Sequence, residues 1–181
     1  MYNKVKSEEE LVAIRKSGEM LANVLQSVCD MAKPGVTGVE IDAHAQEKLK
    51  ELGGVPAFLG YQGFPNAICI SVNDAVVHGI PNDTPLKDGD VVGFDFGVTY
   101  DGMITDAART VIVGTASSEV EQLVKTTKRS LDEAINTVKN GVSIGTISAT
   151  AQDVMEQQNY GVVRDLVGHG VGHHVHEEPE I

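Results

Sequence analysis

The stretch that most constrains the fold is Val91–Thr110 (VVGFDFGVTYDGMITDAART), because it predicts a β-hairpin with acids where a sheet should be apolar. In the first predicted strand, Asp95 shares one face with Gly93 and Gly97, and the large apolar side chains of the strand lie on the opposite face. Asp101-Gly102 is a strong signal for a two-residue turn. The large apolar side chains alternate along one face and are Val92, Phe94, Phe96 and Val98.

The turn decides how the two acids of this hairpin face each other. If Asp101-Gly102 forms the loop, Asp95 lies opposite Ala108 and diagonal to Asp106. A loop shifted by one residue would pair Asp95 directly with Asp106. In both registers the carboxylates share one face, where they repel unless a cation lies between them, and a pair of divalent metals is a common solution. The alternative is that both acids lie on an edge strand and face water.

Composition narrows the class of protein. A chain of 181 residues with 41% hydrophobic content can bury a substantial core. The 26 acidic residues outnumber the 14 basic ones, and the net charge of −12 argues against direct nucleic-acid binding. Because no apolar run approaches the ~20 residues of a membrane span and no signal-peptide core follows Met1, we expect a cytoplasmic protein without membrane contact. Cys29 and Cys69 form no disulfide framework and fit a reducing compartment.

Capping boxes and helical periodicity predict four helices around the strands. The helices are expected from Ser7 to Lys33, from Thr37 to Gly53, from Ser118 to Asn140 and from Ser143 to Tyr160. Besides the hairpin, strands are predicted at Ala67–Val72 and, entering a turn, at Val76–Pro81. The third helix keeps one face apolar, with Val120, Leu123, Val124, Thr127, Leu131, Ile135 and Val138.

An internal repeat indicates duplicated halves. Lys33–Gln46 (KPGVTGVEIDAHAQ) aligns without gaps on Lys139–Gln152 (KNGVSIGTISATAQ), 106 residues later, with seven of fourteen residues identical. Chance similarity between amphipathic helices does not explain the shared Lys-x-Gly-Val-Thr/Ser lead-in. We interpret the chain as one domain, 1–181, with a first α+β half at about 1–115 and a partial second half at about 116–181. Counterparts of Asp95 and Asp106 would fall beyond residue 181, so we expect the second half to be incomplete.

Four of the six histidines lie within eight residues near the end of the sequence. Gly168–Gly172 places His169 in a glycine-rich turn, which lets the backbone bring the imidazole close to another group. His176 precedes Glu177-Glu178-Pro179. A lone histidine in a loop is usually solvated, and the pattern assigns no role to His173 or His174.

Five segments, in this order and spacing, resemble the motifs of type I methionine aminopeptidases, and the resemblance covers the whole chain. It implies an α/β (α+β) pita-bread fold with pseudo-twofold halves and the removal of the initiator methionine from nascent polypeptides. It also implies a monomer when complete, and it allows for ribosome association. The segments are Val77–Pro81, Gly93–Gly97, Ile104–Ala108, Gly168–Gly172 and His176–Pro179.

The resemblance implies roles for individual residues. Asp95, Asp106 and His169 match metal ligands, which we expect to converge in the folded chain. His78 matches a catalytic histidine beside the substrate amide that is not a metal ligand, and His176 one that stabilises the tetrahedral intermediate. Two divalent ions, Mn, Fe, Co or Zn, would produce the attacking hydroxide, and the sequence does not choose among these metals. Tyr61, Phe64 and Cys69 resemble residues that line the methionine pocket, with core packing as the alternative, and Phe58 stands where bacterial relatives can have a smaller residue.

The sequence departs from this family at its C-terminal end. Two metal-binding glutamates of the family would lie beyond residue 181, so the resemblance implies a C-terminally truncated chain. We expect such a chain to hold metal weakly and to be inactive or weakly active alone. Two other functions stay open: a proline-specific peptidase of the same fold, which usually carries an added N-terminal domain, and a non-catalytic pita-bread binding protein, which tends to lose the metal ligands.

Overall fold

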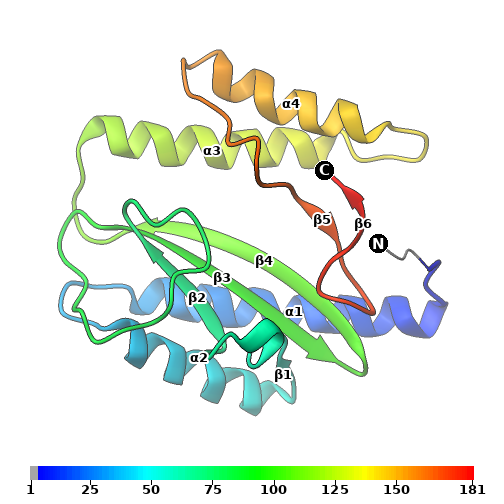
Figure 1. Cartoon of the computed structure of the whole chain (residues 1–181), viewed down its shortest axis with the longest axis horizontal. Coiled ribbons are helices and arrows are strands. Elements are labelled where there is room, and N and C mark those ends of the chain that lie inside the picture. The colour runs from blue at the N-terminus through cyan, green and yellow to red at the C-terminus, as the bar shows by residue number, and fades with distance from the viewer. Residues whose placement is uncertain (1–3) are drawn as a thin grey trace. The chain divides into compact units, whose positions relative to one another are not determined.

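The computed structural model describes residues 4–181, which divide into two compact units (Figure 1). The N-terminal unit comprises residues 4–116 together with Val171–Val175. The C-terminal unit comprises residues 117–170 and 176–181. The short segment Val171–Val175 therefore belongs to the N-terminal unit although the chain on both sides of it belongs to the other.

Two capped helices open the N-terminal unit. Helix α1 (Glu8–Met31) starts at Ser7, whose side chain accepts from the Glu10 N–H while the Glu10 side chain accepts from the Ser7 N–H. Helix α2 (Gly38–Leu52) starts at Thr37 with the same reciprocal pair, made with Glu40, and ends at a left-handed Gly53. Both predicted capping boxes are confirmed.

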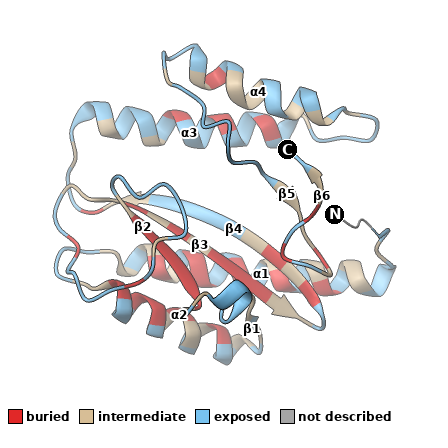
Figure 2. Ribbon diagram, viewed as in Figure 1, coloured by how far each residue is buried: buried red, intermediate tan, exposed pale blue. Residues whose placement is uncertain are grey.

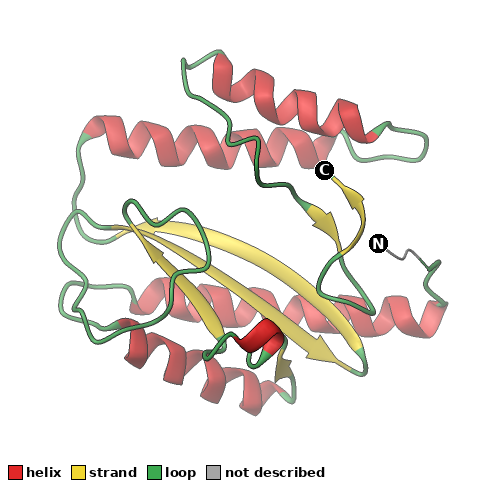
Figure 3. Cartoon of the chain, in the orientation of Figure 1, coloured by secondary structure: helices red, strands yellow, loops and turns green. Residues whose placement is uncertain are grey.

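A four-stranded antiparallel sheet is built around one central strand (Figure 3). β3 (Val91–Tyr100) pairs along one edge with β1 (Val55–Pro56) and β2 (Ile68–Val72), and along the other with β4 (Met103–Ile112). Asp95 pairs with Ala108, and Gly97 pairs with Asp106. The register set by the Asp101-Gly102 turn is confirmed, and the alternative with Asp95 directly opposite Asp106 is wrong.

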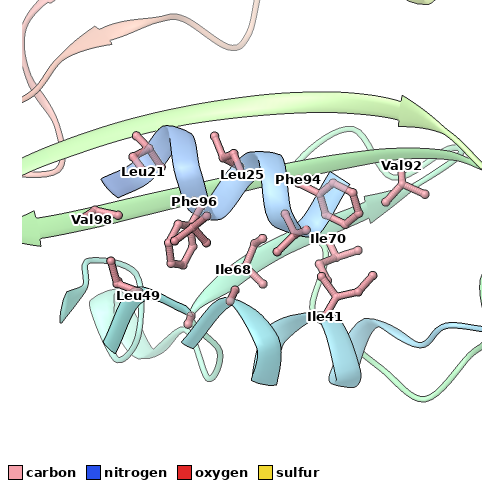
Figure 4. Packing of buried hydrophobic residues seen from close by; sticks show 14 of the residues in the cluster. Leu21, Leu25, Ile41, Leu49, Ile68, Ile70, Val92, Phe94, Phe96 and Val98 are labelled. Atoms are coloured by element: carbon pink, nitrogen blue, oxygen red, sulfur yellow. The ribbon is translucent and has the colours of Figure 1, made fainter. Parts of the chain in front are cut away.

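The hydrophobic core lies between this sheet and the two helices (Figures 2 and 4). The four alternating side chains predicted for β3 are fully buried, which confirms the strand and its inward face. Burying a side chain as large as that of Phe94 or Phe96 stabilises the folded state by roughly 1.5–3 kcal/mol. The helices and β2 supply the other large buried groups, which include Leu21, Leu25, Ile41, Leu49 and Ile68.

The short strand expected at Val76–Pro81 is wrong. Val76 and Val77 are exposed in a loop, and His78 has a positive φ of 57°. Only Gly79 pairs with the sheet, accepting from the Ile70 N–H at 2.8 Å. A longer strand is disfavoured because Pro81 has no N–H to donate to a ladder.

The C-terminal unit contains α3 (Ser118–Asn136), α4 (Ile144–Glu156) and a two-stranded ribbon of β5 (His169–Gly170) and β6 (Glu177–Glu180). Ser143 caps α4 where the sequence predicts, whereas the cap of α3 is Ser117, one residue before the predicted Ser118. The sequence predicts neither strand of the ribbon and places both helix ends four residues too late. At α3 the Thr137 hydroxyl donates to the Ala134 carbonyl, and after α4 Asn159 is left-handed, so local chemistry ends each helix early.

Helices α3 and α4 pack together through small side chains. Ser130 is buried and its hydroxyl donates to the Ala151 carbonyl at 2.8 Å. Thr126 and Ala134 are the other buried residues of α3. The large apolar residues of the predicted face are mostly exposed, and these are Leu123, Leu131, Ile135 and Val138.

Within residues 4–181, none of the helices combines the length and the apolar character that crossing a membrane requires.

Candidate active site

The two acids of the hairpin face each other diagonally across β3 and β4. Asp95 and Asp106 are half-buried on the sheet face opposite the core phenylalanines. Burial, then the charge of Asp95 and a side-chain hydrogen bond with it, raises the pKa of Asp106 to about 8. A hydrogen bond between two carboxyl groups needs a proton, so the pair shares one proton near neutral pH. Such a pair is poised to exchange that proton for a cation.

An apolar wall lies beside the carboxylates. Cys69 of β2 pairs directly with Asp95, and burial followed by the charges of Asp95 and Asp106 raises the pKa of its thiol to about 12. The thiol is therefore neutral and behaves as a small apolar group. It packs with Phe58 and Val175, and Phe64 is partly buried against the same cluster.

Gly97 is required by a close approach of this wall. A Cβ at Gly97 would lie 2.5 Å from a ring carbon of Phe58, whereas a Cβ at Gly93 would meet nothing closer than 3.8 Å. Gly93 therefore leaves room beside Asp95, whereas at Gly97 the ring of Phe58 fills the space. Tyr61, in the short 3₁₀ turn Tyr61–Gly63, is exposed.

His78 projects from the exposed loop that runs beside β2. Its neighbour Gly79 is pinned to the strand, because Gly79 N–H donates to the Ser71 hydroxyl at 3.1 Å and a Cβ there would lie 2.1 Å from the Ile70 carbonyl oxygen. The strand residue next to Ile70 is Cys69. The backbone of His78 is therefore fixed near the apolar wall, and its role toward substrate stays a prediction.

His169, in β5, and His176, directly before β6, contact each other in the C-terminal unit. Their ring centroids lie 4.2 Å apart, with the planes tilted by 43°. The Nδ1 atom of His169 lies 3.0 Å from the Gly170 carbonyl oxygen, which can only accept. In the neutral ring Nδ1 therefore carries the proton and Nε2 the lone pair, which is the state a metal ligand needs.

The segment Val171–Val175 contributes to the site in a way that the sequence analysis missed. Gly172 O accepts from the Ile104 N–H at 2.6 Å, two residues before Asp106. Val175 is buried against Phe58 and Cys69. The available signal was an apolar residue directly before His176, within a run of histidines and glycines.

The donor chemistry of the hairpin fits a divalent cation. Two half-buried carboxylates, one of them with a strongly raised pKa, are stabilised when a dication removes their repulsion. Among residues 4–181, no three or more His, Cys, Asp or Glu side chains are arranged as a metal-binding group. The fit is therefore argued for Asp95 and Asp106 themselves.

This chain belongs to metallopeptidase family M24, whose family model matches residues 12–181. Within the family it is similar to methionine aminopeptidases: the protein of Clostridium perfringens is 41% identical over 177 residues, which cover 98% of this chain and 71% of that relative. The crystal structure of methionine aminopeptidase from Thermotoga maritima superposes with a TM-score of 0.97 at 38% identity, covering 99% of this chain and 73% of that one. A prolidase from Pyrococcus furiosus superposes with a TM-score of 0.86 at 24% identity, and the match covers 97% of this chain and 51% of the prolidase. At this identity the match shows a shared fold alone.

These comparisons confirm the family resemblance drawn from the motifs and the α/β pita-bread fold that it implied. A divalent metal cofactor follows from membership of a metallopeptidase family. The number and identity of the ions stay predictions.

Proposed function

We propose that this chain is a methionine aminopeptidase, which removes the N-terminal methionine of nascent polypeptides. The observation that carries the proposal is the pair of carboxylates, Asp95 and Asp106, placed diagonally on one face of the sheet beside an apolar wall. The similarity to methionine aminopeptidases over nearly the whole chain supports it.

Asp95, Asp106 and His169 would hold the metal. Two divalent ions, Mn, Fe, Co or Zn, would supply Lewis acidity, which lowers the pKa of water and polarises a peptide carbonyl. Asp106 must give up its proton when a cation binds, because its neutral form cannot neutralise a dication. Metal affinity should therefore rise with pH as this proton becomes easier to displace.

The apolar wall would recognise the first side chain of the substrate. Phe58 and Phe64 offer aromatic surface, and the neutral thiol of Cys69 and the methyl groups of Val175 complete it. A methionine side chain suits such a wall, since its flexible thioether adapts to irregular gaps and makes favourable contacts with aromatic rings. Tyr61, on its exposed turn, would extend the same surface.

His78 and His176 would act on the peptide bond itself. His78 would form a hydrogen bond with the substrate amide, and an imidazole N–H of His176 would stabilise the oxyanion that develops on the carbonyl. The Nδ1–Gly170 contact of His169 separates it from these two in role, since it leaves the lone pair on Nε2. A cytoplasmic location, a monomeric enzyme and ribosome association remain predictions.

The test is the release of methionine from Met-Ala-Ser with added Mn or Co. Because the relatives are longer, two proteins are assayed: the 181-residue chain and the same chain extended by the C-terminal segment of a methionine aminopeptidase. In the extended protein we expect Asp106→Asn to lower kcat/KM by at least ~100-fold, which is about 2.7 kcal/mol. Asp101→Asn is the matched control, because Asp101 lies on the same hairpin but in its exposed turn.

Two outcomes would reject the proposal. Hydrolysis of Xaa-Pro dipeptides without release of methionine would assign the chain to the proline-specific peptidases. An extended protein that takes up no metal, although Asp95 and Asp106 are intact, would favour a binding protein.

A further inference from the structure

The segment Val171–Val175 is held on the N-terminal unit by three separate contacts. Its backbone bonds to Ile104 through Gly172 O, and Val175 packs into the apolar wall. The third contact joins His173 Nε2 to Glu10 Oε1 at 2.7 Å. His173 therefore has a defined partner, although the sequence analysis assigned it no role.

Glu10 is a pre-formed acceptor for this histidine. Its other carboxylate oxygen accepts from the Ser7 N–H at 2.7 Å, and Lys4 Nζ donates to Oε1 at 3.3 Å. The backbone hydrogen bond from Ser7, followed by the bond with His173, lowers the pKa of Glu10 to about 2. A carboxylate that is ionised and fixed at a helix start can only accept, so Nε2 of His173 is the donor.

The second capping box of the protein shows what this contact adds. Glu40 in α2 caps Thr37 as Glu10 caps Ser7, and it directs the same carboxylate oxygen to the Thr37 N–H and hydroxyl, each at 2.8 Å. Capping therefore needs only one carboxylate oxygen of Glu10. The hydrogen bond between His173 and the other oxygen plays no part in capping. The side chains of His173 and Glu10 are each only 24% exposed, which distinguishes them from a freely solvated ion pair.

We propose that His173 is a positioning residue that holds Val171–Val175 on the start of α1 through Glu10 and thereby sets the place of Val175 in the apolar wall. Its relevance to substrate rests on the proposed function, because the wall is the surface assigned to the methionine side chain. Only His174 lies between His173 and Val175, so any displacement of the anchor reaches the wall through a few rigid backbone units. The alternative is that His173 and Glu10 form a surface contact that does not affect the position of Val175, since many surface ion pairs contribute little.

The first measurement is hydrogen exchange of the Ile104 amide in the 181-residue chain, because this amide bonds to Gly172 O. His173→Leu should speed its exchange at least ~10-fold by releasing the segment. His173→Gln, which keeps an N–H donor, should restore most of the protection. The Ile70 amide, bonded to Gly79 O, is the internal reference and should not change.

Glu10→Gln and Glu40→Gln form the matched pair of variants. Both weaken a capping box, but only Glu10→Gln should speed exchange at Ile104 and shift the Val175 methyl resonances. Equal effects of the two variants, or an unchanged Ile104 amide in His173→Leu, would overturn the proposal. If His173→Leu does not fold, Glu10→Gln against Glu40→Gln decides the question alone.

Titration with L-methionine, followed on the Val175 methyl groups, separates this inference from the proposed function. In the wild type we expect the Val175 methyl resonances to shift saturably as L-methionine is added. In His173→Leu we expect the Kd for L-methionine to be at least ~10-fold higher. Exchange at Ile104 that responds as expected, in a chain that binds no methionine, would support the positioning role and count against the substrate. Faster exchange at Ile104 with unmoved Val175 resonances would overturn the positioning of the wall.

Discussion

Helices α1 and α3 occupy equivalent places in the internal repeat, but α1 buries two stripes of side chains and α3 buries one (Figure 2). Offset by 106 residues, the buried stripe Met20, Val24 and Val28 of α1 matches Thr126, Ser130 and Ala134 of α3, which is also buried. The second stripe differs: Leu25 is 2% exposed, whereas its counterpart Leu131 is 55% exposed. Ser17 lies on this second stripe, two helical turns before Leu25. Its hydroxyl donates to the Val98 carbonyl oxygen of β3, so the second stripe of α1 faces the sheet.

The comparison separates two things that a hydrophobic pattern can mean. Periodicity shows that a helix has an apolar face, and the same 3.6-residue spacing is present in both helices. It does not show what covers that face. Substitutions at equivalent positions of the two units, or at two positions of one hairpin, separate these two meanings.

The largest difference is expected between Leu25→Ala and Leu131→Ala. Leu25→Ala leaves a cavity in the core and should lower the free energy of unfolding by ~2–5 kcal/mol. Leu131→Ala removes an exposed side chain and should change it by at most ~0.5 kcal/mol. Urea denaturation of both variants measures the contrast, and equal losses would show that the exposed stripe of α3 is covered in solution.

Asp42 and Ser148 are the next matched pair. Asp42 is buried in α2 and accepts from the Ala67 and Ile68 N–H groups at 2.9 and 3.2 Å, so it fixes the start of β2. Asp42→Ala should cost ~1–3 kcal/mol, because these buried donors lose their acceptor. Ser148 lies at the equivalent place in α4, exposed and bonded back to its own helix at Ile144 O. Ser148→Ala should be neutral or slightly stabilising in the same denaturation experiment, and a matching loss there would contradict the comparison.

The shared proton of the hairpin should make the metal-free protein sensitive to pH. Since the pKa of Asp106 is raised to about 8, the stabilisation that its proton gives is complete below the ordinary pKa of 3.8 and is lost as the pH rises through 8. Asp106→Asn keeps a neutral side chain and should raise the Tm at pH 9 by roughly 2–4 °C, the shift that about 1 kcal/mol produces in a domain of this size.

Thermal unfolding in the presence of EDTA, from pH 5 to pH 9, measures this effect. The exposed turn residue Asp101, replaced by Asn, is the control within the same hairpin. A Tm of Asp106→Asn that follows the wild type at every pH would contradict the raised pKa.

The smallest contrast concerns the two caps of the repeat. Thr37 and Ser143 are equivalent, but Thr37 has a reciprocal partner in Glu40, whereas the residue in that place after Ser143 is Thr146. We expect Thr37→Ala to cost ~1 kcal/mol and Ser143→Ala about half as much, because only the first breaks a capping box. Hydrogen exchange in the first turns of α2 and α4 reports each loss locally. A larger loss at α4 would reverse the order.

Features encoded by neighbouring residues could be predicted from the sequence. The Asp101-Gly102 turn sets the register of the whole hairpin, and reciprocal capping starts α1 and α2 where the sequence predicts. The diagonal placement of Asp95 and Asp106 follows from that register. These features depend on turn chemistry and spacing within a few residues, which the sequence displays directly.

Features encoded by distant residues could not be predicted. The contact of His173 with Glu10 joins residues 163 positions apart, and neither residue carries a local signal for the other. Val175 enters the wall only because the chain returns to the N-terminal unit. The valines before His78 favour a strand, but the segment is a loop, because the positive φ of His78 and the single bridge at Gly79 depend on the tertiary fold.

The return of Val171–Val175 to the N-terminal unit also bears on the order in which the protein assembles during synthesis. The rest of that unit ends at Ala116, so its helices and sheet can form while residues 171–175 have not yet been made. Closing so long a loop adds little entropy cost beyond that of a shorter one, so the segment can join a preformed surface. We therefore expect the wall of Phe58 and Cys69 to be completed last, when Val175 arrives. Until then a newly made chain presents an unfinished apolar surface to its surroundings.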